Sequence, residues 1–303
     1  MRLEKANDIV ENSLKDANKA LGKKLDAQVI IFRSPLLIGV DDEMRECIEG
    51  LVDLETKEEH RKLRLCVLIE TNGGYIEVAE RIYRIFRQYY EEVFFIIPSF
   101  AYSAGTVLVL SGDEIYMDYY SVLGPIDPQI DGDNDNDQVP GIGYLIKFNQ
   151  LMKTINADPT GMATAAEMAY LINKFNPAKL FLIEQARDHA VDLLKEWLPK
   201  HKFKNWNETA SGKTSVTEDM KKERASAIAE MLGNPERWHS HGRGIGIKEL
   251  ESDEIKLIVN DFSEDKDLES CIRKYYSLAI DFFAKMQTPN AIHSLASGLR
   301  RVL

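Results

Sequence analysis

The chain has 303 residues, of which 44% are hydrophobic and 29% charged, a composition typical of a globular protein with one large α/β domain or two small ones. Its formal net charge of −11 argues against a nucleic-acid partner and against docking on an anionic membrane, since both need a basic surface. The three cysteines are scattered without disulfide or metal spacing, so we expect a cytoplasmic protein with no cofactor and no metal.

The N-terminal residues are charged and no apolar core follows them. We therefore expect neither a signal peptide nor a membrane anchor here. No run in the sequence approaches the ~18 apolar residues of a membrane-spanning helix.

Apolar runs and amphipathic segments alternate through the first 120 residues. The patterns predict helices at 5–22, 41–54, 76–90 and 103–111, and strands at 28–32, 64–69, 93–97 and 114–117. This alternation predicts parallel strands joined by right-handed crossovers.

The second half of the chain is predicted to be largely helical. Residues 131–138 form an acidic loop, which we expect to be solvated, because Asn136 and Ile142 stand where a calcium loop needs Gly and Glu. Beyond it we expect helices at 143–155, 164–173, 177–198, 217–232 and 268–286, a loop at 199–216, a strand at 254–259 and a polar tail. With no clear linker, we expect a single domain over 1–303, with a core at about 25–130 and helical and closing segments at about 140–290.

Two strand ends carry residues suited to acyl-transfer chemistry. Ser103 lies between the predicted strand 93–97 and an apolar helix, where the free N–H groups of the helix's first turn point toward it. The pair Gly73-Gly74 follows the strand 64–69 and offers a backbone N–H with no side chain in the way. Together they indicate a serine hydrolase, although a plain turn and a helix N-cap are the simpler readings of each half.

The motifs around these residues resemble a known family. Thr71-Asn72-Gly73-Gly74, the run 101–106 (AYSAGT), the run 113–118 (DEIYMD) and the run 123–129 (LGPIDPQ) are similar to the serine dehydrogenase proteinase family, as is 238–245 (WHSHGRGI). That family belongs with signal peptide peptidase A and the Clp protease proteolytic subunit in the Clp/crotonase superfamily. The resemblance implies an α/β, Clp/crotonase-like layered fold with a helical C-terminal half, and a homo-oligomer. It also implies a peptide or protein substrate.

By this resemblance, Ser103 would attack a peptide carbonyl while the N–H groups of Gly74 and Ala104 hold the oxyanion. The Gly73-Gly74 segment could pair with an extended substrate backbone. Asp127 could orient a neighbouring side chain.

The resemblance leaves the general base open. The segment 121–128 lacks the His that Clp-type members use there, whereas signal peptide peptidase A uses a Lys on a later helix. A lysine acts as a base only when burial lowers its pKa, so a lysine on an apolar helix is favoured. The candidates, in order, are Lys179, Lys147, Lys153 and Lys174. His241 is an alternative base, although the patch around it is more simply read as a structural turn. His189 is expected to be structural, and His239 with His241 gives too few ligands for zinc.

Two other functions stay open on the sequence. An acyl-thioester enzyme of the crotonase type would need a carboxylate over the substrate, for which Glu77 is the nearest candidate. A non-catalytic scaffold that kept the fold and lost its base is the other, and the missing His favours it.

Overall fold

The fold is built on a seven-stranded sheet. The computed structural model describes residues 5–55, 63–131, 138–157, 168–170, 173, 175–209, 212 and 214–302. The strand order is β11-β10-β1-β2-β3-β5-β9, and the five strands from β1 to β9 in this order run parallel, whereas β10 is antiparallel to both β1 and β11. The bounds are β1 Gln28–Arg33, β2 Arg64–Glu70, β3 Glu92–Ile96, β5 Glu114–Met117, β9 Asn260–Asp261, β10 Ala291–Ser294 and β11 Gly298–Arg301.

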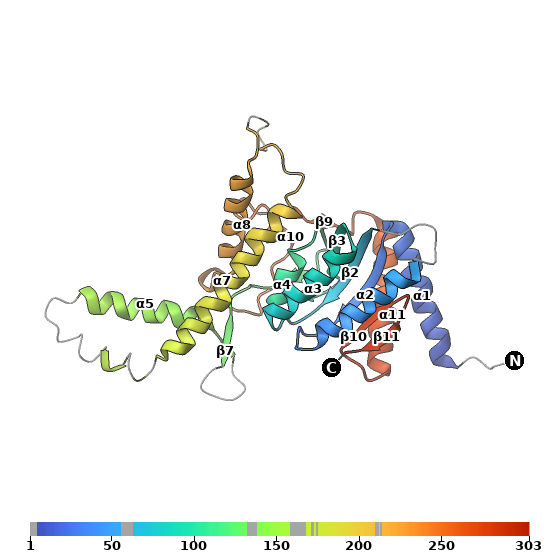
Figure 1. Cartoon of the computed structure of the whole chain (residues 1–303), viewed down its shortest axis with the longest axis horizontal. Coiled ribbons are helices and arrows are strands. Elements are labelled where there is room, and N and C mark those ends of the chain that lie inside the picture. Colours follow the sequence, from blue (N-terminus) through green and yellow to red (C-terminus); the bar gives the residue numbers. More distant parts are fainter. Residues whose placement is uncertain are drawn as a thin grey trace.

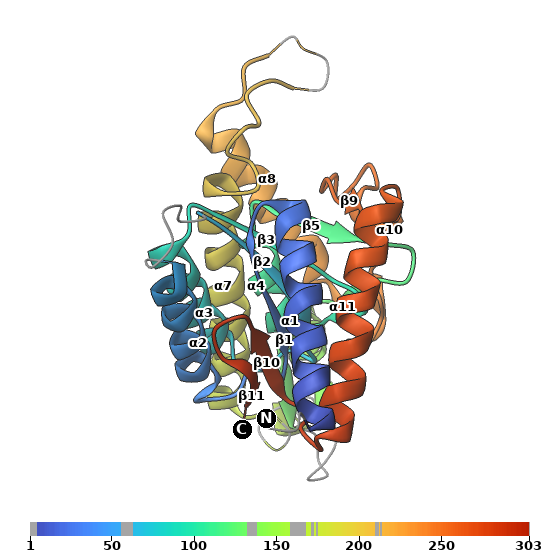
Figure 2. The ribbon, with the colours of Figure 1, turned by 90° about the vertical axis from the view of Figure 1, so that its right-hand side faces the viewer.

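Helices cover both faces of this sheet, as Figure 2 shows. The helices α2 (Val40–Glu55) and α3 (Ile76–Tyr89) lie on one face, and α1 (Ala6–Leu25) and α11 (Lys266–Lys285) on the other. Side chains alternate along a strand, so in β1 Ile30 and Phe32 join the core under α2 and α3, while Val29 and Ile31 join the core under α1 and α11. Parallel strands buried on both faces explain the continuous apolar runs in the sequence.

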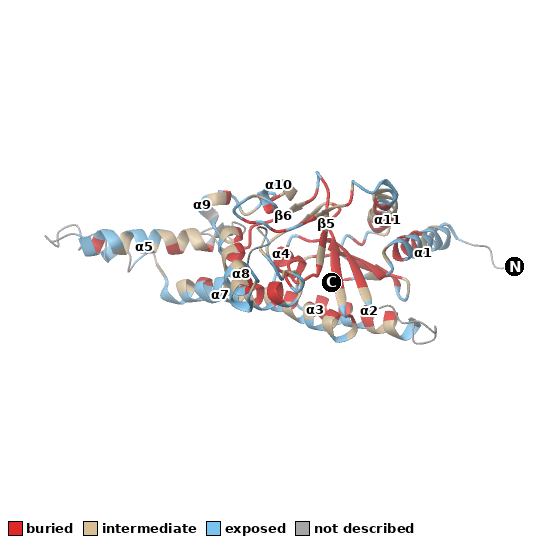
Figure 3. Ribbon diagram, turned by 90° about the horizontal axis from the view of Figure 1, so that it is seen from above, coloured by how far each residue is buried: buried red, intermediate tan, exposed pale blue. Residues whose placement is uncertain are grey.

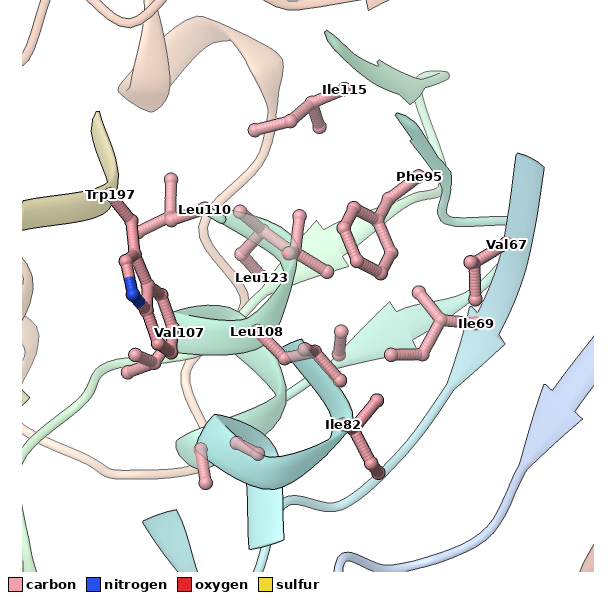
Figure 4. Close-up of a cluster of buried hydrophobic side chains, with 14 of the residues drawn as sticks. Val67, Ile69, Ile82, Phe95, Val107, Leu108, Leu110, Ile115, Leu123 and Trp197 are labelled. Atoms are coloured by element: carbon pink, nitrogen blue, oxygen red, sulfur yellow. The ribbon is translucent and has the colours of Figure 1, made fainter. Parts of the chain in front are cut away.

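A second, smaller layer carries the strand ends of interest. The strands β4 (Phe100–Ala101) and β6 (Val122–Leu123) pair in parallel beside the main sheet. Between them the chain forms α4 (Ala104–Val109), in which every residue is buried. Figure 4 shows Val107 and Leu108 of this helix in one cluster with side chains from β2, β3 and Trp197.

The middle of the chain extends away from the sheet (Figure 1). This arm consists of β7 (Gln129–Asp131), β8 (Gln138–Pro140), α5 (Gly141–Ala157) and the first half of α7 (Pro177–Lys200). Figure 3 shows that α5 and the first half of α7 are mostly exposed or half-buried, whereas the sheet is buried. The second half of α7 returns to the core and packs with α8 (Glu218–Leu232), followed by the short helices α9 (Pro235–Trp238) and α10 (Ile247–Leu250).

The structure confirms the mostly parallel α/β architecture and corrects two predicted elements. The segment 254–259 is not a strand: it forms a turn and an extended stretch, and the strand is the next pair, β9. The predicted polar tail is also wrong, because it forms the β10–β11 hairpin beside β1. The sequence does not indicate this hairpin because β10 buries a polar residue, His293, whose Nδ1 lies 2.6 Å from the Tyr275 hydroxyl and whose Nε2 lies 3.5 Å from Glu11. The predicted helix 164–173 and the loop 131–138 lie largely outside the described residues.

None of the helices within the described ranges is both long and apolar enough to cross a membrane. The three cysteines, Cys47, Cys66 and Cys271, are all free thiols, and burial raises the pKa of Cys47 and of Cys66.

The end of α7 generates a prediction on pH and stability. His201 Nε2 lies 2.9 Å from the Tyr83 hydroxyl, and burial, with the nearby charge of Arg87, lowers the pKa of His201 to about 4. The unfolded pKa is about 6.5, so this group's contribution to the free energy of unfolding is complete above pH 6.5 and is lost as the pH falls toward 4. Between pH 7.5 and 5 we expect the wild type to lose about 1 kcal/mol more stability than His201→Gln, allowing for solvent screening. Urea unfolding of both proteins at both pH values measures this, and parallel losses would contradict it.

Candidate active site

Ser103 occupies a strained turn between β4 and α4. Its backbone has φ 54° and ψ −124°, a region that residues with a side chain rarely adopt. Such conformations persist only where the surrounding structure enforces them, and they gather at functional sites. A strand, a sharp turn carrying a serine and a helix is also the arrangement that exposes the nucleophile in other serine hydrolases.

The Ser103 hydroxyl is not used to cap the helix. Ser103 stands at the N-cap position of α4, where a serine ordinarily accepts a hydrogen bond from the helix backbone, yet it makes no such bond. The side chain is half-buried. The simpler explanation of this serine, an N-cap, is therefore not what the structure shows.

The end of β2 holds the turn in place. Thr71 N–H donates to Phe100 O at 3.2 Å, and Tyr102 N–H donates to Thr71 O at 2.9 Å. Gly73 then passes so close that a Cβ there would lie 2.7 Å from the Ser103 Cβ and 2.6 Å from Tyr102 O. Only glycine fits at Gly73, where φ is +88° as well.

Two backbone N–H groups point to the serine side of this turn. Gly73 O accepts from Leu36 N at 2.8 Å, and because N–H and C=O of a trans peptide point in opposite directions, the Gly74 N–H points away from Leu36 and toward the side where β4 lies. Ala104 is the first residue of α4, so its N–H has no acceptor within the helix. A Cβ on Gly73 would lie 3.3 Å from Ala104 N, which places the two strand ends in direct contact.

Thr106 ties the serine turn to the next strand, and sequence reasoning did not single it out. Its hydroxyl oxygen lies 2.8 Å from the Ala101 carbonyl oxygen and 2.9 Å from that of Gly124, to which its one hydrogen can donate, and it accepts from the Gly124 N–H at 3.0 Å. Gly124 packs against Tyr102, where a Cβ on Gly124 would lie 3.0 Å from the Tyr102 Cα. The available signal was a threonine three residues after the serine, within the first turn of the predicted helix.

Asp127 and His241 form a pair, although they are far apart in sequence. His241 Nδ1 lies 2.9 Å from Asp127 Oδ1, and the second oxygen of Asp127 accepts from Gln129 Nε2 at 2.9 Å. The Asp127 side chain is 2% exposed and that of His241 22% exposed. Of the loop residues around His241, His239 is exposed and has φ 61°.

The candidate lysines lie on the arm. Lys179, in the first turn of α7, is half-buried with its Nζ 5.9 Å from the centre of the Tyr144 ring. Lys147 on α5 is exposed and donates to Gln150 at 3.0 Å, and Lys153 is exposed as well. Lys174 lies outside the described residues. His189 on α7 contacts Glu80 at 3.2 Å, consistent with a structural residue.

A cavity of about 220 Å³ opens at the same edge of the sheet. Its floor holds the ion pair between Arg33 and Glu70, 2.7 Å apart, and Tyr276 donates to Glu70. The cavity reaches Asn72, the residue before the glycine pair, and sequence reasoning gave no sign of it. Its lining residues are Arg33, Ser34, Pro35, Glu70, Thr71, Asn72, Phe100, Pro289 and Asn290.

Solved structures and curated sequences give limited likenesses. The 1510-N membrane-bound stomatin-specific protease, in a serine-to-alanine mutant, is 12% identical with a TM-score of 0.44, and 81% of this chain and 82% of that one are covered. A ClpP1 mutant from Listeria monocytogenes is 14% identical with a TM-score of 0.28, covering 34% and 58%. The uncharacterized proteins MJ0137 and MJ1495 of Methanocaldococcus jannaschii are each 39% identical over 64 residues, 21% of this chain. The chain thus spans about a fifth, 22%, of the length of these curated relatives.

A family profile covers a larger part of the chain. It is the profile of the ClpP-like SDH-type serine proteinases, and it matches residues 55–223. The match takes in the glycine pair at the end of β2, the strained serine turn and the Asp127 segment. Because it extends over more than half of the sequence, this chain belongs to the ClpP-like SDH-type serine proteinase family.

Proposed function

We propose that this chain cleaves peptide bonds with Ser103 as the nucleophile. The observation that carries the proposal is the backbone of Ser103, at φ 54° and ψ −124°, with a hydroxyl that caps no helix. A fold does not keep a serine in so unfavourable a conformation for packing alone when glycine would fit without strain. Membership of a serine proteinase family supports the same chemistry.

The N–H groups of Gly74 and Ala104 would bind the oxyanion of the tetrahedral intermediate. Both are backbone donors whose positions do not depend on a rotamer, so they need no reorganisation as charge develops on the carbonyl oxygen. Gly74 is held by the Leu36 pairing and Ala104 by the buried helix α4. Removing one such donor in other serine hydrolases costs about 10²–10³ in kcat.

The substrate would be a peptide or protein bound in extended form. Tyr75 N–H donates to Leu36 O at 2.8 Å. The Gly74 C=O belongs to the same peptide as this N–H and points the opposite way, so it points away from Leu36. With the Gly74 N–H facing the oxyanion, the Gly74 C=O is the group available to accept from the backbone of a substrate strand. By analogy with relatives of this fold, we propose a cytoplasmic homo-oligomer that shelters the site.

The crotonase alternative receives less support from the structure. Glu77, its candidate carboxylate, is exposed in the first turn of α3. The same pair of N–H donors would bind the carbonyl oxygen of a thioester, but that reaction needs no nucleophilic serine at position 103. A non-catalytic scaffold would also leave the strained serine without a purpose.

A fluorophosphonate probe tests the proposal directly. We expect one adduct per chain by intact mass, located at Ser103 and absent from Ser103→Ala, because only an activated serine displaces fluoride from this probe at a useful rate. Ser99→Ala is the matched control, since Ser99 is also half-buried and lies four residues upstream. Absence of an adduct between pH ~6 and ~9.5, or an adduct that survives in Ser103→Ala, would overturn the proposal and favour the scaffold.

The strain at Ser103 makes a separate prediction about stability. Glycine adopts positive φ without a steric penalty, so Ser103→Gly should have a free energy of unfolding about 1 kcal/mol higher than Ser103→Ala. Ser99 does not have a positive φ, so there the order should reverse, with Ser99→Ala the more stable. Urea unfolding of the four variants measures both differences. An alanine at 103 as stable as glycine would show that the turn is not strained.

A further inference from the structure

The cavity of about 220 Å³ at the edge of the sheet lies next to the serine turn. Asn72, on its wall, directly precedes Gly73, and Phe100, on the same wall, leads into the turn. A Cβ on Gly73 would lie 2.7 Å from the Ser103 Cβ, and neighbouring Cα atoms are about 3.8 Å apart, so the Asn72 Cα lies at most roughly 8 Å from the Ser103 Cβ. Because an extended peptide advances about 3.3 Å per residue, the cavity is within reach of a side chain about two or three residues from the bond that Ser103 attacks.

The carboxylate on the floor of this cavity is already engaged on both oxygens. The Glu70 side chain is only 9% exposed, its Oε1 accepts from Arg33 Nε at 2.7 Å, and its Oε2 accepts from the Tyr276 hydroxyl. Burial, reinforced by the Glu70 carboxylate, raises the pKa of Tyr276, so its hydroxyl keeps the hydrogen that it donates. A cationic group that entered the cavity would therefore find little left to bind.

The donors of Arg33 are not used up in the same way. Its Nε donates to Glu70, and its Nη1 donates to Pro289 O at 3.0 Å. The other N–H groups of this guanidinium have no acceptor among the residues that the structure describes. Arg33 lines the cavity with its side chain 29% exposed, and the exposed side-chain amide of Asn72 adds a donor on the wall. The cavity therefore offers hydrogen-bond donors and one positive charge to a group that carries acceptors.

We propose that this cavity is a substrate subsite that binds one acidic side chain, Asp or Glu, about two or three residues from the bond that is cleaved. The inference rests on the proposed function of Ser103. A guanidinium binds a carboxylate through charge-assisted hydrogen bonds, which are stronger than those it makes to an amide of the same size. The formal net charge of −11 repels strongly acidic peptides as a whole, so the preference is for a single acidic residue at one position.

A second ion pair of the same kind stands at the other end of β2 and serves as a comparison. Arg33 lies opposite Glu70 in the register of β1 and β2, at the end where the cavity opens. Arg64 lies opposite Glu92 in the register of β2 and β3, with Nε 2.8 Å from the carboxylate, and neither residue lines this cavity. Both pairs join neighbouring strands, so a purely structural role would make them equivalent. Only the first pair should affect which peptides are cleaved.

The test is a profile of the bonds that the full chain cleaves in a library of peptides from a digested proteome, identified by mass spectrometry. We expect Asp and Glu to be enriched at one fixed position, about two or three residues from the cleaved bonds. In synthetic peptides that differ only at that position, we expect kcat/KM to be about 10-fold higher with Glu than with Gln, the difference that a hydrogen bond to a charged group makes. Lys at that position should be no better than Gln.

Charge-neutral variants of the two ion pairs test whether the cavity sets this preference. The double variant Arg33→Gln/Glu70→Gln removes both charges together, so no buried charge is left unpaired, and we expect its Glu-to-Gln ratio of kcat/KM to fall to about 1. Arg64→Gln/Glu92→Gln is the matched control and should keep the wild-type ratio. If the first double variant does not fold, Asn72→Asp tests the same point, because it leaves the ion pair intact and places a negative charge on the cavity wall. It should lower the same ratio.

These outcomes separate the subsite from the nucleophile. If Ser103 takes no fluorophosphonate adduct and no peptide is cleaved, the proposed function fails and the subsite fails with it. If wild type cleaves peptides and Ser103→Ala does not, but no position is enriched in Asp or Glu, the proposed function stands and the subsite is wrong. A Glu preference that survives in folded Arg33→Gln/Glu70→Gln, or one that is lost equally in Arg64→Gln/Glu92→Gln, would also overturn the subsite.

Discussion

The close approach of β2's end to the turn after β4 is the constraint on which the site depends. Gly73 must lack a side chain, because a Cβ there would overlap both Tyr102 O and the Ser103 Cβ. Gly105 is subject to the same limit from the opposite side, where a Cβ would lie 2.3 Å from the Thr71 methyl. Because neither glycine carries a side chain, the backbones of the two strand ends come into direct contact beside Ser103.

Burial of α4 supplies the stability that keeps the turn strained. An unfavourable φ,ψ pair costs about 1–3 kcal/mol, whereas each large apolar side chain that becomes fully buried contributes about 1.5–3 kcal/mol. Val107, Leu108 and Val109 are all essentially inaccessible to solvent. The short helix is therefore anchored strongly enough to hold Ser103 in an unfavourable backbone conformation, with a hydroxyl that does not cap the helix.

The sequence predicts the parts of this molecule that depend on local pattern. The strands β1, β2 and β3 are continuous apolar runs because both of their faces are buried, and Gly73-Gly74 and Ser103 stand out because they follow two of those runs. The β10–β11 hairpin is not predicted because β10 has only four residues, and two of its buried positions, His293 and Ser294, are polar. The strand expected at 254–259 was displaced because pairing with β5 begins only at Asn260.

The pairing of Asp127 with His241 could not be read from the sequence for a related reason. The two residues are 114 positions apart, and what joins them is the antiparallel register set by Leu123 and Ile245. Residue type alone therefore favoured a lysine flanked by apolar neighbours as the candidate base, whereas the hydrogen bond between His241 and buried Asp127 is visible only in the fold. His241 also lies beyond residues 55–223, the part that matches the family. The contact between Asp127 and His241 therefore forms only when the segment around Ile245 docks on β6, so it depends on folding of the last third of the chain.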